Sequence, residues 1–157
     1  MLYTSLMKVF IGADHRGFRL KEQLKVLLEE QGYEVVDGGN TVHDPDDDYP
    51  DFVLNIAKQL QKAPEASRGI LICGSGVGVD VAANKFAKIR SVLATNPEQA
   101  AEAREHENVN VVSLSADHIS LDEAQKIIKN FLNTDFPLVE RHVRRLKKIE
   151  KIENDTK

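Results

Sequence analysis

Short apolar runs alternate with amphipathic stretches along most of this chain. The first run, KVFIGAD over residues 8–14, is rich in β-branched and aromatic residues and predicts a buried strand. Residues 17–32 follow with leucines at helical spacing, and Gly32 is a suitable stop for that helix. The pattern therefore opens with one strand and one helix.

The same alternation returns four more times. Two helix starts carry clear capping signals: Asn96 precedes Pro97, and Ser120 stands three residues before Glu123, the spacing of a capping box. We predict strands over 33–39, 68–74, 89–95 and 109–116, and helices over 51–62, from 78 onward, over 96–106 and over 120–133.

Five strands alternating with helices at short intervals indicate one α/β domain over residues 1–157. Its predicted core is a five-stranded parallel sheet with helices on both faces, a three-layer α/β/α sandwich. An extra helix over about 138–151 has no sixth strand to cover, so we expect it to cross the sheet edge or to pack on a partner subunit. We expect an N-terminal extension over 1–6 and a frayed tail over 152–157. The apolar face of the extra helix comprises Val139, Val143, Leu146 and Ile149.

Composition excludes several classes of protein. Of 157 residues, 41% are hydrophobic and 29% charged, and the formal net charge of −4 gives no general attraction to nucleic acid or to an anionic membrane. No apolar run reaches the ~20 residues of a membrane span, and no secretion signal opens the chain, so we expect a cytoplasmic protein. The single cysteine, Cys73, forms no internal disulfide and is expected to stay reduced.

In open parallel sheets, ligands bind beyond the carboxyl ends of the strands. Polar clusters follow four of the predicted strands: ADHRG, HDPDDDYPD, CGSGVG and TNPE. The acidic cluster, with His43 and Asp44 to Asp48, lacks the spacing of a calcium loop, and we interpret it as a solvated loop in which Asp48 helps to shape the rim of the site. No metal site is predicted.

The loop GSGVG, residues 74–78, follows a strand and opens a helix, where backbone N–H groups hold anions. Its spacing and its place after the third strand argue against a dinucleotide site, and the sequence Gly78-Val79-Asp80 excludes a phosphate P-loop. Cys73 is either a small buried hydrophobe or a reactive thiol. At the amino end of a helix it should ionise more readily than a free thiol, which suits proton abstraction next to a carbonyl.

Five stretches in order resemble type B ribose-5-phosphate isomerases and galactose-6-phosphate isomerase subunits: IGADHRGFRLKEQL, DYPDF, RGILICGSGVGVDVAANK, REHENVNVV and FPLVERHVRRL. The resemblance implies a Rossmann-like fold and a metal-independent aldose–ketose isomerase without a cofactor. It also implies a cis-enediolate intermediate, a sugar-phosphate substrate of the pentose phosphate pathway, and a homodimer or homotetramer whose sites lie between subunits.

The resemblance also implies a role for each site residue. Cys73 would be the base that moves a proton between C1 and C2, and His106 would open the sugar ring from a neighbouring subunit, with Asp14 assisting. Tyr49 would line the sugar. The enediolate oxygen would be held by Ser75 and the amides of Gly74, Gly76 and Gly78.

His15, Arg141 and Arg145 match positions that bind the phosphate. The two arginines stand at i and i+4, so one helix face presents both guanidinium groups. Taken alone, they would be a solvated basic helix end. Apolar positions interrupt the basic residues of this helix, which weakens a nucleic-acid interpretation.

Three departures from the family add negative charge: Asp80, Glu107 and Asp117, the last where the family usually carries an arginine. One hypothesis is a different substrate, a six-carbon or otherwise modified sugar phosphate, because an acid facing a phosphate lowers affinity. The alternative is that these acids turn outward or pair with Arg104, Lys85 or His118.

The main prediction is conversion of ribose 5-phosphate to ribulose 5-phosphate. A rival from another class is a non-catalytic, sugar-phosphate-binding partner subunit. The presence of Cys73, with Asp14, His15, Ser75 and His106, favours an enzyme.

Overall fold

The sheet of the computed structural model has five parallel strands, as the sequence predicts. The structure describes residues 7–156, and the predicted extension over 1–6 lies outside them. The strand order is β2-β1-β3-β5-β4, and every neighbouring pair is parallel. The bounds are β1 Lys8–Ala13, β2 Glu34–Asp37, β3 Ser67–Cys73, β4 Ser91–Leu93 and β5 Val111–Ser115.

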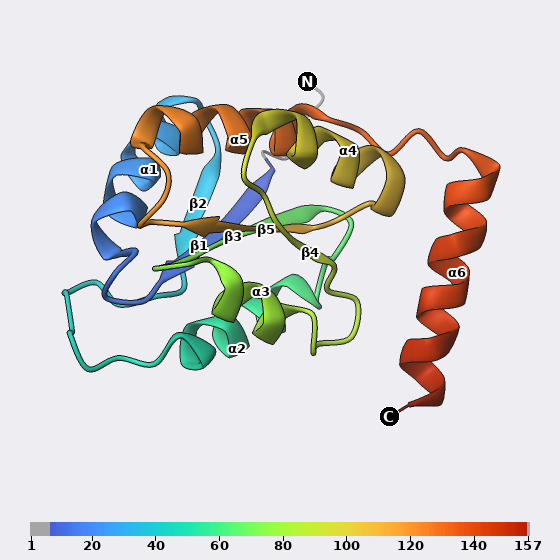
Figure 1. Ribbon diagram of the computed structural model, residues 1–157, viewed down its shortest axis with the longest axis horizontal. Coiled ribbons are helices and arrows are strands. Elements are labelled where there is room, and N and C mark those ends of the chain that lie inside the picture. The colour runs from blue at the N-terminus through green and yellow to red at the C-terminus, as the bar shows by residue number, and fades with distance from the viewer. Residues whose placement is uncertain (1–6, 157) are drawn as a thin grey trace, which may run out of the picture.

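Helices cover both faces of this sheet (Figure 1), which confirms the three-layer prediction. Helices α1, α4 and α5 lie on one face, and α2 and α3 lie on the other. The bounds are α1 Phe18–Glu30, α2 Tyr49–Leu60, α3 Val77–Ala83, α4 Pro97–Glu107, α5 Leu121–Asn133 and α6 Glu140–Asp155.

The central strand β3 divides the core into two apolar clusters. All seven of its residues are buried. Ile70 and Ile72 point into the cluster shared with α1 and α5, whereas Leu71 and Cys73 point into the cluster under α2 and α3. The two-residue period of a strand therefore places the thiol on the α3 side of the sheet.

The predicted helix starts are confirmed where a cap was visible in the sequence. The Asn96 side chain accepts from Gln99 N at 2.8 Å, and Ser120 and Glu123 form both bonds of the capping box. Helix α2 starts at Tyr49, two residues before the predicted start, because Pro50 fits the first turn of a helix.

Helix α6 lies beside the β4 edge and contacts the rest of the chain near its two ends (Figure 1). His142 packs against α4, and the Glu153 carboxylate accepts from Lys88 N at 3.2 Å. The predicted helix end at Lys151 is wrong: a 2.7 Å Lys151–Asp155 pair stabilises the last turn, so residues 152–155 are helical and not frayed.

The outer face of α6 is not covered by any part of residues 7–156. Val139, Ile149 and Ile152 are 38%, 46% and 63% exposed. Across residues 7–156, no helix combines the length and apolar character that crossing a membrane demands. An amphipathic helix with an open apolar face is typical of a surface that meets another subunit.

Candidate active site

Three loops meet at the carboxyl edge of the sheet. Asp14 N donates to Ile72 O at 3.2 Å, which joins the loop after β1 to β3. Ala116 N donates to Cys73 O at 2.9 Å, and Asp117 N donates to Gly74 O at 3.0 Å, which joins β5 to the loop after β3. The polar clusters predicted after β1 and β3 therefore lie together, joined by a loop after β5 that was not among the four predicted clusters.

The glycine loop folds back over the Cys73 thiol. Gly76 has a φ of +76°, and a Cβ at that residue would lie 2.9 Å from the carbonyl carbon of Leu114, so only glycine fits. In this conformation Gly76 N donates to Cys73 Sγ at 3.2 Å, although Cys73 is only 4% exposed. The Cys73 thiol therefore lies directly beneath a backbone N–H of the glycine loop.

Ser75 and Tyr49 flank this loop. Ser75 is exposed at the tip of the loop, where its Oγ accepts from Val77 N at 3.2 Å. The Tyr49 ring packs on Gly78, at which a Cβ would lie 2.7 Å from the ring carbon Cζ. The structure therefore brings both predicted residues to the same loop as Cys73.

Asp14 is buried and holds the turn after β1. Its Oδ1 accepts from Arg16 N and from Gly17 N, both at 3.0 Å. These two bonds hold Asp14 at the same sheet edge as Cys73. They leave Asp14 Oδ2 for the substrate, and the role of Asp14 in ring opening stays a prediction.

His15 has a partner that the sequence pattern does not reveal. Asp47 Oδ1 accepts from His15 N at 2.9 Å and lies 2.8 Å from His15 Nδ1. The hydrogen bond to Asp47 raises the pKa of His15 above its usual value. The prediction of a solvated acidic loop is wrong at Asp47, whose side chain is 6% exposed, since its position in a run of similar acids gives no signal of this contact.

The three departing acids are located in different places. The Asp80 carboxylate accepts a hydrogen bond from Ser91 Oγ at 2.6 Å, which ties it to β4. Glu107, in contrast, is exposed at the end of α4. Asp117 forms an ion pair with Arg16. Arg16 is not among the partners proposed for the three acids, and one of those, His118, lies 2.7 Å from Ser115 Oγ.

Arg104 is unsuited to pair with any of these acids because it is buried elsewhere. It donates to Thr134 O at 3.1 Å and to Val109 O at 2.6 Å. Burial lowers the pKa of Arg104 to about 10, and the carbonyls of Val109 and Thr134 hold its guanidinium.

The remaining predicted residues lie at the opposite end of the molecule. Helix α4 begins at the carboxyl edge of the sheet and ends at the amino edge, so His106 and Glu107 are far from the glycine loop of their own chain (Figure 1). The His106 ring lies 4.6 Å from the ring of buried His142, and Arg141 Nε donates to His142 Nε2 at 3.2 Å. One chain therefore does not bring these residues to Cys73.

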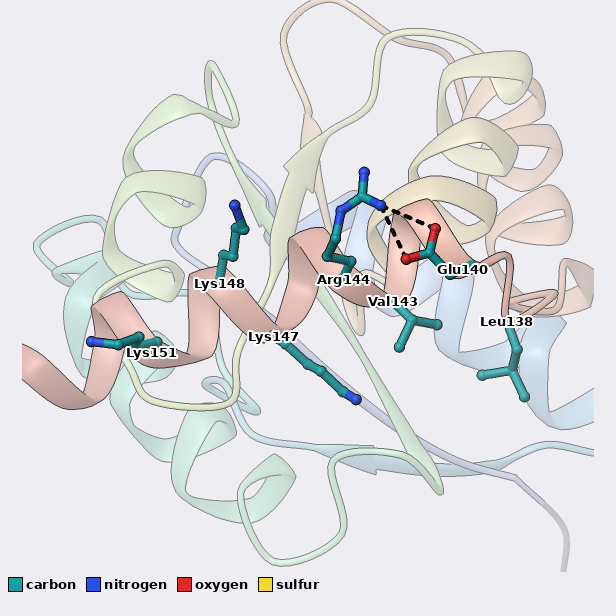
Figure 2. Close-up of a pocket in the computed structure, with 7 residues that line it drawn as sticks. All are labelled: Leu138, Glu140, Val143, Arg144, Lys147, Lys148 and Lys151. Carbon is teal, nitrogen blue, oxygen red and sulfur yellow. Dashed lines mark hydrogen bonds and ion pairs between the residues drawn. The ribbon is translucent and has the colours of Figure 1, made fainter.

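Helix α6 carries a shallow hollow of about 500 Å³ on its outer side (Figure 2). Leu138 and Val143 form its apolar part, and Glu140 pairs with Arg144 at 3.0 Å. Arg141 and Arg145 are exposed on the same helix. The predicted phosphate-binding arginines thus stand on a helix with few contacts to its own domain.

The site residues form two groups, one around the buried Cys73 at the carboxyl edge and an exposed one on α4 and α6. A sequence model of the Ribose/Galactose Isomerase family matches residues 9–149. Ribose-5-phosphate isomerase B of Escherichia coli is 37% identical over 148 residues, which cover 94% of this chain and 97% of that protein. The Mycobacterium tuberculosis enzyme of the same name is 38% identical over 140 residues, with 89% and 86% covered.

Solved structures agree with these relatives. Ribose-5-phosphate isomerase B from Mycoplasma genitalium, with bound ribulose-5-phosphate, superposes with a TM-score of 0.91 at 40% identity and covers 95% of this chain and 97% of that one. The Clostridium thermocellum protein gives 0.90 at 40% identity, with 96% and 100% covered. The likeness therefore extends over sequence and fold together.

Proposed function

Because this chain belongs to the ribose/galactose isomerase family, we propose that it interconverts ribose 5-phosphate and ribulose 5-phosphate. The relatives that share nearly its whole length carry the name ribose-5-phosphate isomerase B, and the Mycoplasma genitalium relative holds ribulose-5-phosphate. The observation that carries the proposal is the buried Cys73 thiol beneath the Gly76 N–H, 3.2 Å from it.

The chemistry follows from this geometry. The Cys73 thiolate removes the proton from C2 of the open-chain aldose, and the C–H electron pair forms the C1–C2 double bond while the C1 carbonyl oxygen becomes an alkoxide. The glycine-loop amides and the Ser75 hydroxyl donate to this oxygen in the resulting cis-enediolate. Transfer of the C2 hydroxyl proton to O1 and return of the proton from sulfur to C1 then give the ketose, with its carbonyl at C2. The Cys73 side chain carries the proton between the two carbons, so we assign no metal or cofactor.

A second copy of the chain completes the site in this proposal. His106, Arg141 and Arg145 lie away from Cys73 of their own chain, while the apolar face of α6 is uncovered. In a homodimer or homotetramer, His106 would open the sugar ring bound at a neighbouring glycine loop, and the two arginines would reach its phosphate. His15 adds a cation from the first subunit.

The alternatives have less support. The changed-substrate hypothesis rests on three added negative charges, but Asp80 bonds to Ser91, Asp117 pairs with Arg16, and Glu107 lies exposed at the end of α4. The names of the relatives also favour ribose 5-phosphate over a six-carbon sugar. A non-catalytic subunit would have no need of a glycine loop that donates to a thiol.

A direct test follows proton exchange by NMR. The protein should exchange deuterium from heavy water into C1 and C2 of ribose and ribulose 5-phosphate, and dialysis against EDTA should leave the rate unchanged. Cys73→Ser should lose exchange and keep phosphate binding, because a hydroxyl does not ionise near neutral pH. Binding without exchange by the unmodified protein would instead identify a binding subunit, and full activity of Cys73→Ser would remove the assigned base.

A further inference from the structure

Arg16 is the one lysine or arginine in the five loops that follow the strands. These loops carry several carboxylates, among them Asp14, Asp47 and Asp117, and their remaining cationic candidates are histidines. A sugar phosphate brings up to two further negative charges into this acidic surface. The loops are residues 14–17, 38–48, 74–76, 94–96 and 116–120.

The Arg16 side chain lies against the glycine loop. A Cβ placed on Gly74 would lie 2.6 Å from Arg16 Nε and 2.8 Å from its Cζ, so a glycine at residue 74 leaves the space that the guanidinium occupies. Gly74 directly follows Cys73. The only permanent cation of these loops is thereby held against the glycine loop at the rim of the site.

Asp117 fixes the guanidinium from the other side. Its carboxylate accepts from Arg16 Nη2, and its own backbone N–H donates to Gly74 O at 3.0 Å. Asp117 and Gly74 thus hold one guanidinium between the loops after β1, β3 and β5. This pair joins residues 101 positions apart and so ties the loop after β1 to the loop after β5.

The guanidinium keeps hydrogen-bonding capacity for a ligand. Within residues 7–156, Asp117 is the one hydrogen-bond partner of this side chain, which is 57% exposed. An arginine has five N–H donors, and planar pairs of them suit phosphate oxygens. His15, the preceding residue, adds a second cation when it is protonated.

We propose that Arg16 binds the substrate phosphate from the subunit that supplies Cys73, and that Asp117 is the positioning residue for Arg16. This inference rests on the proposed function, since it takes a phosphorylated sugar as the substrate. The phosphate is distant from the reacting carbons and is bound alike in the ground state and the transition state. Loss of Arg16 therefore raises KM and leaves kcat nearly unchanged.

The first test compares Arg16→Ala with Arg19→Ala as a matched control, because Arg19 is an exposed arginine one turn along α1. Arg16→Ala should raise KM for ribose 5-phosphate about tenfold, raise the inhibition constant of inorganic phosphate by a similar factor, and keep kcat within about threefold. Arg16→Lys should recover part of the loss, since it keeps the charge but lacks the planar donors. An unchanged KM relative to Arg19→Ala would overturn the inference.

The second test separates positioning by Asp117 from a purely structural bridge. Asp117→Ala alone should raise KM about threefold because Arg16 loses its anchor. In the Arg16→Ala background the same change should lower KM, because it removes an unpaired carboxylate beside the phosphate. Variants that lower only the melting temperature, with KM unchanged in both backgrounds, would refute the inference.

Failure of the proposed function gives a different result. If the unmodified protein does not turn over ribose 5-phosphate, the isomerase proposal fails. Phosphate titrations followed by ³¹P NMR then decide the inference separately: weaker binding by Arg16→Ala than by Arg19→Ala supports it, and equal binding overturns it.

Discussion

The carboxyl edge of the sheet and the α4–α6 end of the molecule carry the two groups of site residues in contrasting ways. At the carboxyl edge, Cys73 is 4% exposed, and backbone bonds between three loops fix its surroundings. At the other end, Arg141 and Arg145 are exposed on a helix that contacts its own domain mainly near its two ends. The first group is ordered by the fold of one chain, whereas the second would act, in the proposed oligomer, on the site of a neighbouring subunit.

The sharpest test of this division mixes two inactive variants. Cys73→Ser disables the first group and His106→Gln the second, so neither homo-oligomer should isomerise ribose 5-phosphate. After co-refolding, mixed dimers hold one intact site each, and random pairing should restore about a quarter of the unmodified rate. The isomerase assay of the mixture, beside each variant refolded alone, measures this.

Two outcomes would contradict the division. A mixture as inactive as its components would place both groups in one chain. Full activity of His106→Gln alone would remove His106 from the reaction.

The next largest effect concerns the rigid group. Gly76→Ala forces a Cβ into a φ of +76° and against Leu114, and should lower the free energy of unfolding by about 3 kcal/mol and abolish turnover. Gly32→Ala is the matched control: its φ is +89°, but nothing lies within 4 Å of the added Cβ, so only about 1 kcal/mol of backbone strain is expected. Denaturant unfolding and activity assays separate the two.

Equal destabilisation of the two variants would mean that backbone conformation alone, and not the close approach to β5, requires a glycine at residue 76.

A smaller effect is expected from Asp47→Asn, which alters the electrostatics of the first group without breaking its backbone. The Asp47 hydrogen bond raises the pKa of His15, so the imidazolium persists to higher pH in the unmodified protein. The contribution of the His15 imidazolium to phosphate affinity is complete below the ordinary histidine pKa of about 6.5. It is lost as the pH rises through the raised pKa of His15. In the variant, KM should begin to rise at lower pH, and should be about threefold higher near pH 7.5.

A KM–pH profile that coincides with that of the unmodified protein would show that His15 does not bind phosphate as a cation. His43→Gln, a nearby histidine 6.5 Å from the His15 ring, controls for a second titrating group.

Most of the fold follows from local patterns in the sequence. The five strands and their helices were predicted because each apolar run and each helical face is complete within about 15 residues. The caps at Asn96 and Ser120 were visible because their partners lie three residues away. The end of α6 was predicted at Lys151 because the residues that follow are polar. The Lys151–Asp155 ion pair stabilises the last turn, so the helix continues to Asp155.

The site was predictable in its residue types but not in its contacts. The Asp47–His15 and Asp117–Arg16 pairs join residues 32 and 101 positions apart, and no periodicity links such positions. The expected partner Arg104 was excluded only by its burial at the end of α4. The sequence does contain a signal for Arg16, since no other lysine or arginine occurs in a loop after a strand.

Helix α4 spans the sheet from one edge to the other and so keeps His106 away from Cys73 of the same chain. With the site shared between subunits as proposed, this places catalysis under mass action. A dilute solution would hold folded chains with intact glycine loops and almost no turnover, and specific activity would climb with protein concentration until the oligomer saturates. The amount of the enzyme would then set its rate per molecule as well as its total output.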